Sequence, residues 1–181
     1  MITQERLKHL LLYDPETGVF RHLKPPDRIC RMKEGDIAGT VGGSRTHRYR
    51  KLCVDGEYYY AHHLAWLYEN GEWRDRIDHK DRDGLNNSIS NLRPCTQSQN
   101  MINSVTTKLN KYGFRGVRYH RDRAKPYSSR IRVNKKDICL GYFKTPEEAS
   151  DAYIKAAVKH FGEFADIHLL ATRTAHEEAR G

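Results

Sequence analysis

Residues 77–100 read IDHKDRDGLNNSISNLRPCTQSQN, and this stretch decides the fold of the first part of the chain. Asp78 and His79 are expected to end a short strand. Residues 80–91 predict a polar loop, because they are crowded with Asp and Asn, which favour turns. Residues 91–95 are expected to be extended, since their proline disfavours a helical residue before it. The stretch therefore predicts two short extended segments joined by a long polar loop.

A helix is expected to follow the second extended segment. Thr96 and Gln99 have the spacing of a capping box, in which a hydroxyl caps the first turn and an amide side chain reaches back. The helix is therefore predicted over residues 97–103, and it carries Asn100 one turn after its start.

This arrangement suits hydrolysis of a phosphodiester, which needs a base for water and a cation for the developing oxyanion. Imidazole, with an ordinary pKa of ~6.5, can be that base at neutral pH. Hard divalent cations prefer carboxylate and amide oxygens. Asp78 and His79 face opposite sides of a strand and could act on two sides of one phosphate. Asn100 can point back at Asp78, and Asn91 can orient His79. The alternative is that these Asp and Asn residues only shape turns.

Short elements are expected before this stretch. Residues 61–70 look helical and stop at Gly71, and Asp55-Gly56 marks a hairpin turn. The other elements expected here are an amphipathic helix over residues 4–12, a strand over residues 19–21 and the hairpin strands 49–54 and 57–60.

The charge of the chain is concentrated in one later segment. The chain has 181 residues and a formal net charge of +9. Residues 108–144 hold 12 basic and two acidic residues, whereas residues 1–107 have a net charge of only +2. The basic segment predicts strands over residues 116–120, 127–133 and 138–143, with a turn at 135–137. A helix capped by Thr145, with Pro146 at its first position and Glu148 completing a capping box, is expected next.

The predicted strands separate basic and apolar side chains. Alternation places Arg130 and Arg132 on one face and Ile131 on the other, and Arg118 belongs to the basic face of the neighbouring strand. Such a sheet fits the ~12 Å major groove of DNA, where arginine pairs with guanine edges and phosphates. The alternative is an ordinary half-solvated sheet.

Several classes of protein are not expected. No apolar run approaches the ~18 residues of a membrane span. Acidic residues within the first 20 positions argue against a secretory signal. The four cysteines form no C-x-x-C pair, so no structural zinc is expected and a reducing cytoplasm fits best.

Residues 61–66 (AHHLAW) together with residues 77–100 resemble the HNH endonuclease family, in particular the homing endonucleases of bacteriophages. The likeness rests on the Asp78-His79 pair, the Asn91-Leu92-Arg93 triplet and Asn100. It implies a ββα-metal unit in which Asp78 and Asn100 bind Mg²⁺ or Mn²⁺. It also implies that His79 is the general base and that Asn91 positions it.

The likeness has two departures. Asn100 stands at the third position of the histidine-asparagine-histidine pattern, as in phage homing members. His62-His63 replaces a His-Arg pair, and we interpret these two histidines as packing against the nuclease strand. Arg93 is a candidate phosphate contact.

Residues 112–166 resemble the plant ethylene-response-factor (Apetala-type) DNA-binding domain. The likeness rests on Arg115-Gly116-Val117-Arg118, Ile131-Arg132, Leu140-Gly141-Tyr142-Phe143 and the Ala-rich helix. It implies DNA contacts by Arg115, Arg118 and Arg132, with Arg121 as a further candidate. Arg130 is a candidate from the strand alternation alone. Tyr127 and Cys139 replace the tryptophans of that family, and Arg130 replaces an acidic residue, so the site preference of plant members is not carried over.

The sequence thus predicts an α+β protein: a β-rich region with an HNH unit over residues 1–103, a linker over 104–111, a DNA-binding domain over 112–166 and a tail over 167–181. The expected function is a metal-dependent endonuclease acting on double-stranded DNA in the cytoplasm of a bacterial host, as a monomer or homodimer and without a membrane. The alternatives are a non-catalytic, sequence-specific DNA-binding regulator and an RNA-binding or structural protein of a virion.

Overall fold

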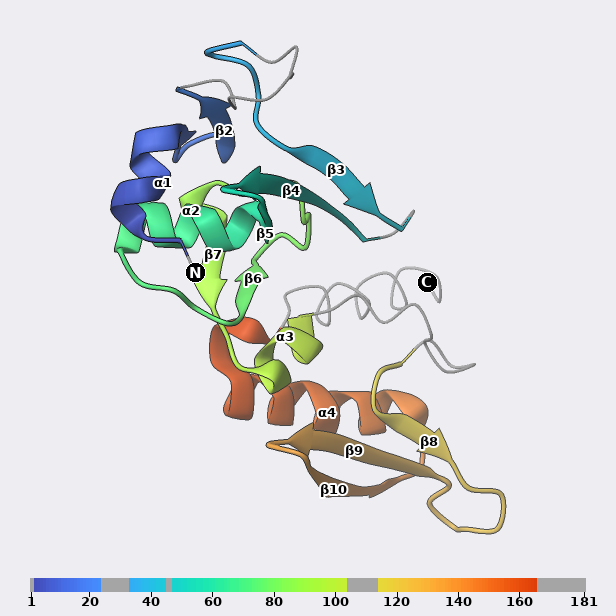
Figure 1. The fold of residues 1–181 in the computed structure, drawn as a ribbon. Helices are drawn as coiled ribbons and strands as arrows, with labels where there is room; N and C mark the ends of the chain where they lie inside the picture. Colours follow the sequence, from blue (N-terminus) through green and yellow to red (C-terminus); the bar gives the residue numbers. More distant parts are fainter. Residues whose placement is uncertain (1, 24–32, 45–46, 104–113, 166–181) are drawn as a thin grey trace. The chain divides into compact units, whose positions relative to one another are not determined.

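The computed structural model describes residues 2–23, 33–44, 47–103 and 114–165, and Figure 1 shows their helices and strands. The chain divides into two compact units, Met1–Cys95 and Thr96–Gly181. The sequence predicts a boundary after residue 103, whereas in this division the helix that follows Cys95 falls in the second unit. The predicted linker and tail lie outside the described residues. No helix in the described part is both long and apolar enough to cross a bilayer.

The first unit is built from short elements. Its sheets are the antiparallel pairs β1-β2 and β6-β7 and the antiparallel sheet β3-β4-β5. The elements are α1 (Gln4–Leu10), β1 (Leu11–Asp14), β2 (Val19–His22), β3 (Thr40–Gly43), β4 (Arg48–Val54), β5 (Glu57–Tyr60), α2 (Ala61–Asn70), β6 (Ile77–His79), a 3₁₀ turn (Ile89–Asn91) and β7 (Leu92–Pro94).

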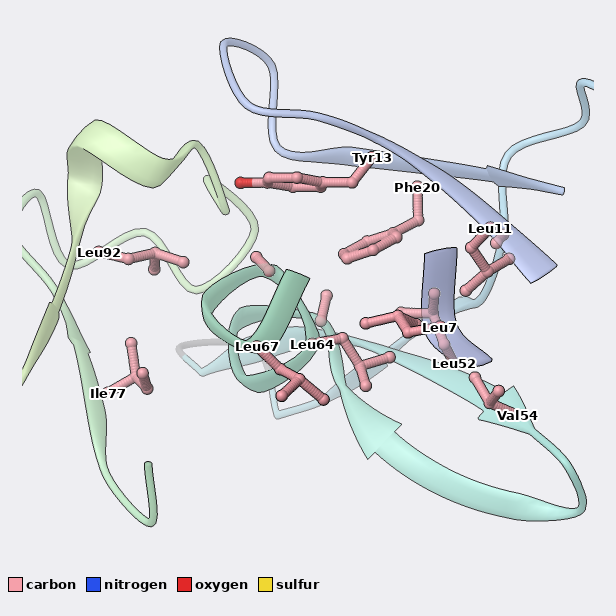
Figure 2. Packing of buried hydrophobic residues seen from close by; sticks show 13 residues of the cluster. Leu7, Leu11, Tyr13, Phe20, Leu52, Val54, Leu64, Leu67, Ile77 and Leu92 are labelled. Carbon is pink, nitrogen blue, oxygen red and sulfur yellow. The ribbon is translucent and has the colours of Figure 1, made fainter. Parts of the chain in front are cut away.

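Helix α2 is the centre of the hydrophobic core of this unit (Figure 2). Leu64 and Ala65 are fully buried, and Ile77 of β6 and Leu92 of β7 belong to the same cluster. Other members come from α1, the β1-β2 hairpin and the β4-β5 hairpin: Leu7, Leu11, Tyr13, Phe20, Leu52 and Val54. The core therefore attaches the strand pair that bears Asp78 and His79 to α2.

Local signals explain most of these boundaries. Helix α2 ends at Gly71, whose φ of 71° is left-handed, as the sequence predicts. Asp55 and Gly56 have φ of 50° and 84°, which suits the tight turn of the predicted β4-β5 hairpin. The helix predicted over residues 4–12 ends at Leu10 instead. Leu11 pairs with β2, because the strand buries Leu11 and Tyr13 on alternate positions.

The second unit contains α3 (Gln97–Asn103), β8 (Val117–Tyr119), β9 (Tyr127–Val133), β10 (Lys136–Phe143), α4 (Pro146–Phe161) and a 3₁₀ turn (Gly162–Phe164). Its antiparallel sheet has the order β10-β9-β8, and α4 packs on it through the buried Ala149, Tyr153 and Ala157. Ala152, the residue before Tyr153 on α4, is only half-buried.

The predicted capping box at Thr96 is confirmed, whereas the one at Thr145 is confirmed only for the hydroxyl cap. Thr96 N donates to Gln99 Oε1 at 2.7 Å, and Gln99 N donates to Thr96 Oγ1 at 3.3 Å. Glu148 N donates to Thr145 Oγ1 at 3.2 Å, but the Glu148 carboxylate accepts from Lys144 N rather than from the cap residue.

The turn between β9 and β10 differs from the prediction. Asn134 and Lys135 have φ of 48° and 67° and form it, whereas Lys136 and Asp137 already pair in β10. A two-residue turn with positive φ matches the twist of the two strands better than the three-residue turn that the charge cluster suggested.

Candidate functional site

Asp78 lies in a buried ion pair on the β6-β7 ladder. Asp78 is directly opposite Arg93 in the register, and the two residues are only 5% and 8% exposed. Arg93 donates from Nε and Nη2 to Asp78 Oδ2 at 3.0 and 2.9 Å. Arg93, expected from the sequence to contact phosphate, is therefore the partner that balances the charge of Asp78 and fixes its orientation.

The imidazole of His79 is held by an amide that the sequence did not single out. His79 Nε2 lies 3.2 Å from Asn87 Oδ1, and Asn87 is 1% exposed. The backbone carbonyl of Asn87 accepts from the Tyr13 hydroxyl at 2.7 Å, and its Nδ2 donates to Leu85 O. When Nε2 donates to Asn87, the basic lone pair of His79 lies on Nδ1.

Asn91 does not make the contact that was predicted for it. Its Nδ2 donates to Asp81 Oδ1 and Asn86 O at 2.9 and 2.8 Å, and its Oδ1 accepts from Asp81 N at 3.0 Å. Asn91 thus ties the loop across its base, and the loop in turn presents Asn87 to His79. The direct orientation of His79 by Asn91 is corrected to an indirect one, because the side chain of Asn91 is used within the loop.

Asp81 is part of the same loop network. Burial alone would raise its pKa, but hydrogen bonds from Asn86, the Asp83 amide and Asn91 outweigh that effect and lower the pKa below its ordinary value. Asp81 is therefore ionised at neutral pH, where it accepts hydrogen bonds that keep the loop closed.

The two histidines of α2 have different surroundings. The His62 ring lies edge-to-face against His79, with centroids 5.1 Å apart and an interplanar angle of 82°. His63 instead stacks on Trp73 and has its Nδ1 2.8 Å from Arg74 O. The interpretation of packing against the nuclease strand is thus confirmed for His62. Burial, followed by the charges of His63 and His79, lowers the pKa of His62 to about 2, so this ring is neutral.

The remaining predicted metal ligand, Asn100, stands on α3 in the second unit. Among the described residues no group of three or more His, Cys, Asp or Glu side chains could hold a metal ion. The predicted donor set is smaller: one carboxylate, from Asp78, and one amide oxygen. Carboxylate and amide oxygens are donors that a hard cation such as Mg²⁺ takes, usually one or two from protein, with phosphate and water completing its shell.

The basic face of the second unit has the predicted composition. Arg118, Arg130 and Arg132 share one face of the β8-β9-β10 sheet, and all three are exposed. Arg132 Nε is 3.9 Å from Asp137 Oδ1 on the same face. Arg121, just after β8, is also exposed. The opposite face carries Ile131 toward α4, as alternation predicts.

Arg115 has a structural partner within its own unit. Its Nη1 and Nη2 donate to Ile102 O and Met101 O at 2.7 and 2.5 Å. These carbonyls are at the C-terminal end of α3, where backbone acceptors lack helical partners. The predicted DNA contact by Arg115 therefore competes with its capping of α3. No sequence pattern predicts this capping role.

Comparisons with known proteins agree with the HNH likeness of residues 61–66 and 77–100. Residues 59–102 match the family model described as HNH endonuclease. Over 89 residues the chain is 37% identical to an uncharacterized HNH endonuclease of Acanthamoeba polyphaga mimivirus, an alignment that covers 49% of this chain and 44% of that relative. The chain thus spans less than half the length of this relative. No solved structure matches the chain significantly.

The family match ends at residue 102, so the likeness of residues 112–166 to the ethylene-response-factor domain stays a prediction. The matched segment includes Asp78, His79, Asn91, Arg93 and Asn100. Residues 59–102 therefore carry the likeness to the HNH endonuclease domain.

Proposed function

We propose that this chain is a metal-dependent endonuclease of the homing type that hydrolyses phosphodiester bonds in duplex DNA. One observation carries the proposal: His79, held by Asn87, stands next to Asp78 on β6 within the HNH match. A base and a candidate cation ligand on adjacent positions of one strand suit the two sides of a phosphate.

In this proposal His79 accepts the proton of the attacking water at Nδ1, in the tautomer that Asn87 favours. Arg93 holds the Asp78 carboxylate in place, and Asn100 keeps its predicted part as the second ligand of Mg²⁺ or Mn²⁺. The cation, when bound, supplies the positive charge that stabilises the oxyanion and the leaving oxygen.

The basic face of the β8-β9-β10 sheet is proposed to bind the duplex. Its support is the exposure of Arg118, Arg130 and Arg132 on one face, together with the net charge of residues 108–144. Residues 1–107 are nearly neutral overall, so most of the salt-sensitive affinity is expected from the sheet.

Nicking of supercoiled plasmid tests the catalytic proposal. The wild-type chain is expected to nick with Mg²⁺ or Mn²⁺ and not with EDTA. His79→Ala is expected to lose about 10²- to 10⁴-fold in rate, the usual contribution of a general base. His160→Ala, at an exposed position of α4, is the matched control and should retain the wild-type rate.

A non-catalytic DNA-binding regulator is the second candidate, because Arg93 already balances the charge of Asp78 without a cation. Under this alternative the wild-type chain binds duplex DNA in a mobility-shift assay and leaves bound plasmid supercoiled with either metal. Cleavage that depends on His79 excludes the regulator. Preference for RNA over duplex DNA at matched salt would instead favour an RNA-binding role.

A further inference from the structure

We propose that His62 is a positioning residue for His79, acting through its ring rather than through a hydrogen bond. This inference rests on the proposed function, because it takes His79 as the general base. It concerns a residue for which the sequence offered only a packing interpretation.

His62 occupies a fixed place between the core and His79. It is the second residue of α2, and the following Leu64 and Ala65 are fully buried, so the helix that carries it is anchored. Its ring stacks on Tyr60, with centroids 5.4 Å apart and an angle of 14°. Tyr49 lies against both imidazoles, 5.8 Å from His62 and 6.2 Å from His79. Hence His62 has little freedom to move away from His79.

The polar atoms of His62 do not explain its place. The ring is 8% exposed, and its Nδ1 is buried without a hydrogen-bond partner among the residues that the structure describes. A buried nitrogen in this state destabilises the fold, whereas an apolar ring of similar size avoids the loss. The His62 ring contacts the His79 ring edge-to-face, a geometry that aromatic pairs favour.

Together with Asn87, this contact restrains the imidazole of His79. Asn87 fixes one ring nitrogen, while the His62 ring limits tilting of the ring plane. Because His62 stays neutral, it adds no repulsion when His79 takes up a proton. Precise aim matters, since a misplacement of about 1 Å can cost ~100-fold in rate.

Steady-state nicking of supercoiled plasmid by the 181-residue chain with Mg²⁺ tests the inference. His62→Ala is expected to lower kcat about 10- to 100-fold and leave KM within about twofold, the pattern of a lost transition-state interaction. His62→Phe keeps an aromatic ring and is expected to restore kcat to within about threefold of wild type. His160→Ala, at an exposed position of α4, is the control and should keep the wild-type kcat.

A second readout does not depend on cleavage. In ¹H–¹⁵N spectra of the histidine rings, with His79 assigned by its loss in His79→Gln, wild type and His62→Phe should show one sharp set of His79 signals. His62→Ala should show broadened or doubled signals. A wild-type chain that cleaves, with His62→Ala equally active and its His79 signals unchanged, overturns the inference.

Equal loss of kcat in His62→Phe and His62→Ala also overturns it, because the nitrogen rather than the ring would then be required. If the wild-type chain does not cleave at all, the proposed function fails, but the ring signals still decide whether His62 restrains His79.

Discussion

At the scale of single residues, the Asp78–Arg93 ion pair shows how burial decides what a charge contributes. Both side chains are at most 10% exposed. Arg93→Ala leaves the Asp78 carboxylate buried without its partner, and such a loss typically costs about 3–5 kcal/mol in the free energy of unfolding. Urea denaturation at neutral pH measures this cost.

The control for this prediction is Arg6→Ala. It breaks an ion pair with Asp55 of similar length, 2.8 Å, but both of its side chains are about half exposed. Water screens that pair, so its loss should be far smaller. The double substitution Asp78→Asn with Arg93→Met should recover part of the stability lost in Arg93→Ala. Equal costs for Arg6→Ala and Arg93→Ala would contradict the buried pair.

The burial of His62 predicts how the free energy of unfolding depends on pH. Burial holds its pKa at about 2 in the folded protein, against an ordinary 6.5. The unfolded chain binds a proton there below pH ~6.5 and the folded chain does not, so this contribution is present above pH 6.5 and is lost as the pH falls toward 2. His62→Phe removes the group. Between pH 7.5 and pH 5, wild type should lose about 2 kcal/mol more unfolding free energy than His62→Phe.

Urea titrations of both proteins at the two pH values check this. The rings of His63 and His79 lie beside His62 in both proteins, so only the difference between the two curves is assigned to His62. Parallel losses in the two proteins would show that His62 is not neutralised by burial.

The sequence predicted a strand that bears Asp78 and His79, and the structure has it as β6, but the contacts of the two side chains were not predicted. Asp78 and His79 stand adjacent on a strand, as proposed from the pattern alone. Asn91 was expected to orient His79, whereas in the structure the side chain next to the His79 ring nitrogen is that of Asn87. Several Asn and Asp residues in the loop can form turns, and composition cannot tell which amide turns inward. That choice is made by tertiary contacts such as the Tyr13 hydroxyl.

At the scale of elements, the β1-β2 hairpin supports the loop that carries Asn87. Ile89 N donates to Pro15 O at 3.0 Å, and a Cβ at Gly18 would lie 2.2 Å from the backbone carbon of Asn87. A methyl group there forces the hairpin and the loop apart. Gly18→Ala should therefore destabilise the protein and reduce nicking, because Asn87 is displaced from His79.

Gly56→Ala separates this clash from backbone strain. Gly18 and Gly56 both have positive φ, 71° and 84°, so each substitution carries a left-handed penalty of about 1–2 kcal/mol. A Cβ at Gly56 meets no atom within 4 Å. Thermal unfolding and nicking should show a larger loss for Gly18→Ala than for Gly56→Ala. If the two substitutions cause identical losses, the β1-β2 hairpin does not support the site.

The elements themselves were largely predictable where a local signal marks their ends. Gly71, the two Thr caps and Asp55-Gly56 each act within a few residues, and those boundaries agree with the structure. The end of α1 was misplaced, since the apolar run after Lys8 fits a helix or a strand equally well. Only pairing with β2 selects a strand from Leu11 onward.

At the scale of the whole molecule, charge and candidate chemistry lie in different parts of the chain. Asp78 and His79 belong to a part with little net charge, while the basic residues gather in 108–144. This division predicts that affinity and turnover respond to different substitutions. It could be read from the sequence, because charge counting needs no contacts. The capping of α3 by Arg115 could not, because it depends on how the chain folds back.

The salt dependence of binding tests this division on the 181-residue chain. The triple substitution Arg118→Gln, Arg130→Gln and Arg132→Gln removes three exposed charges from one sheet face. Each lost phosphate contact lowers the slope of log K against log salt by about 0.9, so the slope should fall by about 3 at most. The double substitution Lys155→Gln with Lys159→Gln, on exposed positions of α4, should change the slope much less.

At saturating protein the nicking rate of the triple variant should approach that of wild type, because the substitutions are far in sequence from Asp78 and His79. If the triple substitution leaves the slope unchanged, this sheet is not the DNA-binding surface.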